Sequence, residues 1–155
     1  MLQRIQSVLL LLSAIALGVF LSTNLWTSQT ATGEVIVNPY HVLVTQGGLS
    51  SFSQDIFYIA VMAALAILLA IFTIFQYKNR IRQMLFVALN SLLIGAAVAV
   101  GVYHVKYDGM AVEGAGEGNF DIGIYAGFAA LALNWLANRF IKKDEKLVKS
   151  ADRMR

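Results

Sequence analysis

Four apolar stretches, each close to 20 residues long, dominate this chain of 155 residues. They cover residues 8–26, 56–77, 84–103 and 122–141, and the one charged side chain within these limits is Arg139. A helix needs about 20 apolar residues to cross the hydrocarbon of a bilayer, and it satisfies its own backbone hydrogen bonds there. We therefore predict an all-α transmembrane protein in which residues 1–155 form a single four-span domain.

The composition agrees with this prediction. The chain is 58% hydrophobic and 14% charged, whereas about 25% of the residues are charged in an ordinary soluble domain. The absence of cysteine excludes disulfides and thiolate metal sites. Residues 8–21 also resemble the core of a secretory signal peptide, but "STNLWTSQTA" after them offers no small-x-small cleavage site, so we favour a retained helix.

Lysine and arginine alternate between the connections. Arg4, residues 78–82 and residues 139–155 carry eleven of the twelve basic side chains, and the other two connections carry only Lys106. Basic flanks of spans stay in the cytoplasm. This predicts four spans with both termini in the cytoplasm. Because the connections are short, we expect the four helices to form an antiparallel bundle.

The two outer connections, residues 27–55 and 104–121, show strand patterns. The first contains "GEVIVNPYHVLVTQGG", in which two β-branched runs flank residues 38–40. This predicts a β-hairpin with a three-residue turn. The segment "YHVKYDGM" at residues 103–110 suggests a third strand, so we expect a small extracytoplasmic sheet. The alternative is an irregular surface loop.

Both histidines, His41 and His104, fall on this outer face with acidic residues nearby. Imidazole and carboxylate suit zinc, but these two residues lack a tight ligand spacing. We interpret them as polar loop residues and assign no metal ligand. Haem is disfavoured because neither histidine lies inside a span. We also assign no cofactor or catalytic residue, since "GAGEGN" lacks the lysine and the context of a phosphate loop.

Every span carries small residues at steps of three or four, the pattern by which helices pack closely in lipid. These residues are Ala14, Gly18 and Ser22 in the first span, Ala60, Ala64, Ala66 and Ala70 in the second, Ser91, Gly95 and Ala99 in the third, and Gly123, Gly127, Ala130, Asn134 and Asn138 in the fourth. We predict that each set faces the interior of the bundle.

Four polar residues lie at a similar depth in the spans: Ser13, Thr73, Asn90 and Asn134. One hypothesis is a path for a substrate or a proton. The other, which we favour, is hydrogen bonding between helices, because the transport of charge usually needs ionisable groups inside the membrane.

The last 14 residues, 142–155, hold six basic and three acidic side chains and no helix breaker. We predict that the fourth helix continues into the cytoplasm, with Leu147, Ala151 and Met154 on one stripe. The basic residues could serve as an anchor on anionic lipid. The mixed charge also fits a docking helix for a cytoplasmic partner.

The first residues, "MLQRIQSVLLLL", and the last, "KKDEKLVKSADRMR", resemble a bacterial family of small four-span integral membrane proteins that is catalogued as a domain of unknown function. The resemblance covers the whole chain. It implies a bacterial inner-membrane protein and no activity, so it transfers no functional residue to this sequence.

Three functions remain to be weighed. We favour a non-catalytic accessory or assembly subunit that binds other membrane proteins, because the spans combine small-residue faces with no core charge. The alternative is a carrier or channel for a small neutral or lipidic molecule, which needs a cavity. An enzyme is disfavoured because no nucleophile, carboxylate pair or metal cluster has usable spacing. We expect the lipid bilayer and a membrane protein or second copy as partners, and no nucleic acid.

Overall fold

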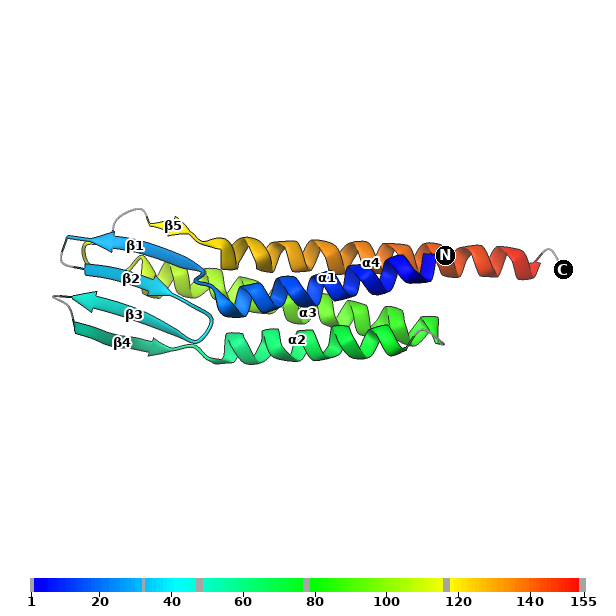
Figure 1. The fold of residues 1–155 in the computed structure, drawn as a ribbon, viewed down its shortest axis with the longest axis horizontal. Coiled ribbons are helices and arrows are strands. Elements are labelled where there is room, and N and C mark those ends of the chain that lie inside the picture. Colours follow the sequence, from blue (N-terminus) through cyan, green and yellow to red (C-terminus); the bar gives the residue numbers. More distant parts are fainter. Residues whose placement is uncertain (1, 32, 47–48, 77–78, 116–117, 154–155) are drawn as a thin grey trace.

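The computed structural model describes residues 2–31, 33–46, 49–76, 79–115 and 118–153 (Figure 1). They form four α-helices, one π-helical turn and five strands. The elements are α1 (Leu2–Ser22), β1 (Trp26–Thr30), β2 (Gly33–Val37), β3 (His41–Gln46), β4 (Leu49–Asp55), α2 (Tyr58–Phe75), α3 (Arg80–His104), η1 (Val105–Gly109), β5 (Asn119–Phe120) and α4 (Ile122–Arg153). The helices lie side by side and the sheet lies at one end of them (Figure 1). We call this the sheet end and the opposite one the tail end.

Helices form at all four predicted apolar stretches. Helices α1, α2 and α3 contain segments that are long and apolar enough to cross a membrane. Within the described residues, α4 is not among these candidates, because Asn134, Asn138 and Arg139 lower its mean hydropathy. Helix α1 contacts α2 and α4, and α3 also contacts α2 and α4.

Two helix boundaries differ from the sequence prediction in an informative way. Helix α1 ends at Ser22, four residues before the predicted limit, because Trp26 begins strand β1. Helix α4 continues without interruption to Arg153. The predicted helical extension at the end of the chain is therefore present.

The predicted hairpin is confirmed, and it is part of a larger antiparallel sheet with the strand order β4-β3-β2-β1-β5. Its turn depends on Asn38, whose Oδ1 accepts hydrogen bonds from the backbone N–H groups of Tyr40 at 2.9 Å and His41 at 2.8 Å. Such side-chain bonds to the following backbone are typical of Asn in turns. The connection over residues 27–55 therefore folds into four strands, two more than the sequence predicted.

The third strand predicted at residues 103–110 is wrong. Helix α3 runs to His104 and the π-helical turn η1 follows it. A Cβ on Gly109 would lie 2.9 Å from Val37 Cγ2 and 3.1 Å from the Trp26 ring. The missing side chain thus lets the helical backbone rest directly on β1 and β2. The fifth strand is instead β5, which pairs with β1.

The predicted small-residue faces are confirmed in part. In α4, Gly123, Gly127, Ala130 and Asn134 are buried and Asn138 is half-buried. In α1, Ala14 is buried, Gly18 half-buried and Ser22 exposed. In α2, Ala60, Ala66 and Ala70 are buried but Ala64 is exposed.

The prediction for α3 is confirmed only in part. Ser91 and Gly95 are half-buried and Ala99 is exposed, whereas Val87 and Ile94 are buried. Gly127 explains the difference, because an added Cβ there would lie 2.7 Å from Val98 Cγ2. A small residue on α4 thus makes room for a large side chain on α3, so the contact face of α3 includes large residues and only part of the predicted small-residue set.

Candidate functional site

Two fully buried asparagines, Asn90 and Asn134, face each other from α3 and α4. Asn90 Nδ2 donates to Asn134 Oδ1 at 3.1 Å. Asn134 Nδ2 donates to the backbone oxygen of Val87 at 3.0 Å and to Ser91 Oγ at 2.7 Å. The structure thus brings together the two asparagines that the sequence placed at one depth.

The two hydroxyl residues of the predicted layer are also buried, but they bond to backbone. Ser13 Oγ donates to the carbonyl of Ala130 at 2.9 Å, which links α1 to α4. Thr73 Oγ1 donates to the carbonyl of Leu69 in its own helix at 2.6 Å. The Ser13 hydroxyl therefore links two helices, whereas the Thr73 hydroxyl forms its hydrogen bond within its own helix.

Sequence reasoning missed two glutamines, Gln6 and Gln83, which are each 2% exposed. Gln83 Nε2 donates to the carbonyl of Thr73 at 3.5 Å and so links α3 to α2. Both residues lay just outside the predicted span limits, where a polar side chain looks like part of a connection. Because α1 and α3 begin earlier than predicted, these amides lie between helices.

The buried groups are neutral, which limits their chemistry. Amides and hydroxyls donate and accept hydrogen bonds, but they do not ionise near neutral pH. Among the described residues, Asn90 Oδ1 and Gln6 Nε2 are buried without a hydrogen-bond partner. The arrangement therefore suits contacts between helices or with an uncharged polar molecule.

A second cluster lies at the sheet end and joins α2 to α3. The Tyr58 hydroxyl contacts His104 Nε2, and His104 Nδ1 contacts the Asp108 carboxylate. His104 is 5% exposed. A carboxylate only accepts hydrogen bonds, so Nδ1–H donates to Asp108 and Nε2 accepts from the tyrosine O–H. The imidazole is therefore fixed in one orientation.

Sequence reasoning missed this cluster because it treated residues 103–110 as a strand. A signal was nevertheless present. Tyr58 opens the second predicted span and His104 follows the third, and antiparallel neighbours bring these ends together. His104 and Asp108 are also four residues apart, which places them on one helical face.

A carboxylate, an imidazole and a hydroxyl occur in the same order in the triads of hydrolases, where the imidazole takes the proton of the hydroxyl and the carboxylate orients the imidazole. Such chemistry also needs a place for a substrate. The three pockets described here are lined by other side chains. The contacts themselves make the cluster a polar link between the first turn of α2 and the last turn of α3.

The two histidines that suggested a metal site have different neighbours. His104 lies between Tyr58 and Asp108, while the ring of His41 at the start of β3 packs against Tyr40. Within the described ranges, no group of three or more His, Cys, Asp or Glu side chains comes together.

A comparison with known families identifies the chain. Residues 2–154 match the family described as a domain of unknown function, DUF4293. The chain belongs to the DUF4293 family. The match spans every element from α1 to α4, so helices and sheet together make up the DUF4293 fold. Among curated proteins, none matches the chain. The resemblance to a family of unknown function is thus confirmed.

Proposed function

We propose that this chain is a non-catalytic accessory or assembly subunit that binds other membrane proteins in a bacterial inner membrane. In this proposal the helices form an antiparallel four-helix bundle, the sheet is extracytoplasmic, and both termini are cytoplasmic. The charge pattern supports this orientation, because basic residues concentrate at the tail end while the sheet end carries Lys106 alone.

The main support for this proposal is the part of α4 that extends beyond the other helices. Arg80 Nη1 lies 3.3 Å from Asp144 Oδ2 and donates to the Asp144 carbonyl at 3.2 Å. Asp144 is therefore level with the first residue of α3. Helix α4 then continues to Arg153, which at 1.5 Å per residue is about 14 Å of further helix. Figure 1 shows it reaching past the other helices.

The surface of this extension suits a protein partner. Leu147 is 51% exposed and Val148 is 46% exposed. Because residues 142–155 carry more basic than acidic side chains, the complementary partner is an acidic cytoplasmic surface with an apolar groove, belonging to another membrane protein. Docking of a helix in a groove is a common mode of recognition.

The interior supports an accessory subunit more than a carrier. Asn90 Nδ2, Asn134 and Ser13 form hydrogen bonds with neighbouring helices. The pockets described here are not lined by any of these three residues. A carrier needs its polar interior groups to face a cavity.

A site-specific crosslinking experiment tests the proposal. A photo-reactive amino acid is placed at Leu147, or at Leu68 on the exposed face of α2 as a control. We expect one defined membrane protein with an acidic cytoplasmic surface to be captured from position 147 and not from 68. The purified partners should then bind, and Leu147→Asp with Val148→Asp should weaken binding at least about tenfold, the loss typical of an interface hot spot.

Two results would contradict the proposal. One is a purified pair that does not bind, and the other is a double variant that binds as tightly as the natural chain. Adducts made only with second copies of this chain would instead indicate a homo-oligomer without an accessory role.

A further inference from the structure

A pocket of about 400 Å³ lies on α4 near the tail end. Its volume falls within the range of small-ligand sites, about 300–1,000 Å³. The residues that line it are Trp135, Asn138, Arg139, Lys142, Lys143 and Lys146. Four of these six side chains are cationic, and the set contains no carboxylate.

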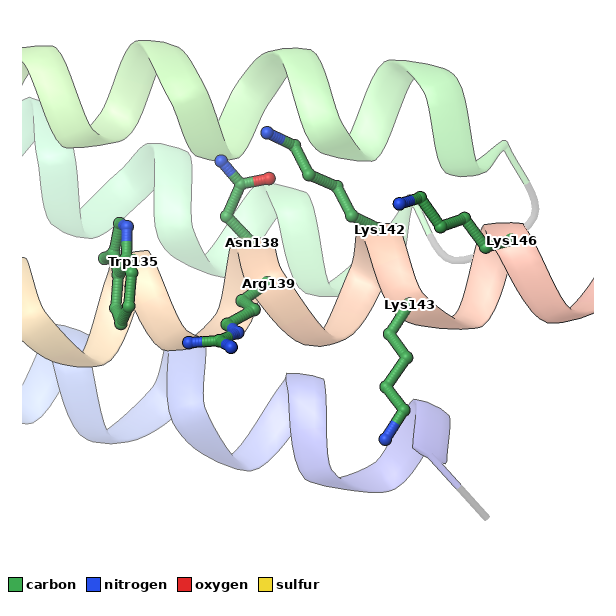
Figure 2. Close-up of a pocket in the computed structure, with 6 residues that line it drawn as sticks. All are labelled: Trp135, Asn138, Arg139, Lys142, Lys143 and Lys146. Carbon is green, nitrogen blue, oxygen red and sulfur yellow. The ribbon is translucent and has the colours of Figure 1, made fainter.

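The cations lie on two sides of α4. Figure 2 shows Lys142 and Lys146 leaning back along α4 on the side of Asn138, while Lys143 extends on the other side toward the start of α1. Residues four apart lie on one face of a helix, so Lys142 and Lys146 form a pair beside Asn138. Asp144, which lies between Lys143 and Lys146 in the sequence, forms an ion pair with Arg80.

Two uncharged groups complete the pocket. The guanidinium carbon of Arg139 lies 5.7 Å from the ring centroid of Trp135, within the range of a cation–π interaction. Asn138 Oδ1 is buried and has no hydrogen-bond partner among the described residues. The pocket thus offers several positive charges together with one hydrogen-bond acceptor.

We propose that this pocket binds the headgroup of an anionic phospholipid in the leaflet at the tail end. The phosphate diester lies between Lys142 and Lys146, on the side of α4 that carries Asn138. Basic pockets beside spans on the cytoplasmic side are suited to anionic headgroups. Trp135 lies at the hydrocarbon edge of the site, where aromatic side chains are enriched.

The depth of the pocket favours a lipid over a soluble anion. Lys142 and Lys143 lie within one helical turn of Asp144, which is level with the start of α3. The apolar segments of the neighbouring helices end at this level. Phosphates of a bilayer lie at the ends of such segments, so a lipid arrives with its charge beside these lysines.

Titration of the detergent-solubilised full chain with phosphatidylglycerol tests the inference, with phosphatidylcholine as the zwitterionic comparison. We expect one phosphatidylglycerol to bind per chain in preference to phosphatidylcholine. Replacing Lys142 and Lys146 by alanine should weaken binding about fivefold per cation, since each basic residue near anionic lipid contributes about 1 kcal/mol. The variant with arginine at both positions should bind like the natural chain.

Arg82→Ala is the matched control, because Arg82 is an exposed cation at the same end and does not line the pocket. It should leave lipid binding unchanged, and thermal unfolding should be the same for every variant. Equal binding of the two lipids, or an equal loss in Arg82→Ala, overturns the inference. So does equally tight binding of glycerol 3-phosphate, which would make the site one for a soluble anion.

The inference does not depend on the docking helix. Leu147 and Val148 do not line the pocket, so the variant with aspartate at both positions should keep phosphatidylglycerol binding even where it loses a protein partner. Failure of one proposal is therefore distinguishable from failure of the other.

Discussion

Replacing Asn134 with leucine measures what the buried amides contribute. The change removes three hydrogen bonds, made with Asn90, with the carbonyl of Val87 and with Ser91. Hydrogen bonds between helices in membranes average about 0.6 kcal/mol each, so the expected loss of stability is about 2 kcal/mol. Leucine has a similar size, which keeps changes in packing small.

A double-mutant cycle isolates the contact between the two amides. Asn90→Leu removes only the bond to Asn134, so it should cost about 0.6 kcal/mol. The doubly substituted chain should lose less than the sum of the two single losses, because the shared bond is counted twice in that sum. The expected coupling is about 0.6 kcal/mol.

Unfolding by sodium dodecyl sulfate in mixed micelles, followed by far-ultraviolet circular dichroism, provides the measurement. Additive losses, or a loss below about 0.5 kcal/mol for Asn134→Leu, would refute the reasoning, since three average bonds are worth more. A third outcome would be informative in another way. If Asn134→Leu stays folded yet loses its crosslinked partner, the amide layer does more than hold helices together.

Three further predictions concern helix packing, one hydrogen bond and the membrane topology. Gly127→Ala should destabilise the chain by about 1–3 kcal/mol in the same assay, because the new methyl would overlap a neighbour, whereas Gly95→Ala has nothing within 4 Å and should not. Tyr58→Phe should cost about 0.5–1.5 kcal/mol through one lost hydrogen bond, and no change in the unfolding midpoint would contradict the link between α2 and α3. The chain has no cysteine, so a membrane-impermeant maleimide should label Tyr40→Cys in spheroplasts but Ser150→Cys only after lysis; the reverse pattern would invert the proposed topology.

The sequence predicted the helices and the hairpin because the features that specify them lie within each segment. Long apolar runs predicted the helices, since nothing but burial or lipid accommodates them. The hairpin was predictable because Asn38 stabilises its own turn, with both bonds made to residues two and three positions later. Neither inference required knowledge of a distant neighbour.

The segment after α3 shows where local reasoning fails. Its β-branched and aromatic residues favour a strand, yet it forms η1. Two distant contacts decide the outcome. Gly109 lets the helix rest on Trp26 and Val37, and His104 is held by Tyr58 and Asp108. A preference of less than about 1 kcal/mol per residue is easily outweighed by such packing.

The prediction of the contact face of α3 was incomplete for a related reason. Small residues occur on more than one face of α3, so spacing alone cannot select the one that meets α4. The choice depends on the partner, because Asn134 requires Asn90 opposite it and Gly127 requires a large side chain opposite it. Size and polarity therefore have to be matched between two helices, and one sequence stripe contains only half of that information.

Helix α4 brings these points together. Part of its low hydropathy comes from residues that do not face outward, since Asn134 is fully buried and Asn138 is half-buried, while Arg139 is exposed near the tail end. Before Arg139, its exposed face carries the large hydrophobic side chains of Ile122, Tyr125, Phe128 and Trp135. A water-soluble helix has the opposite arrangement, with polar residues outside. The inverted arrangement supports α4 as the fourth span, because only lipid accepts that outer face while the amides bond within.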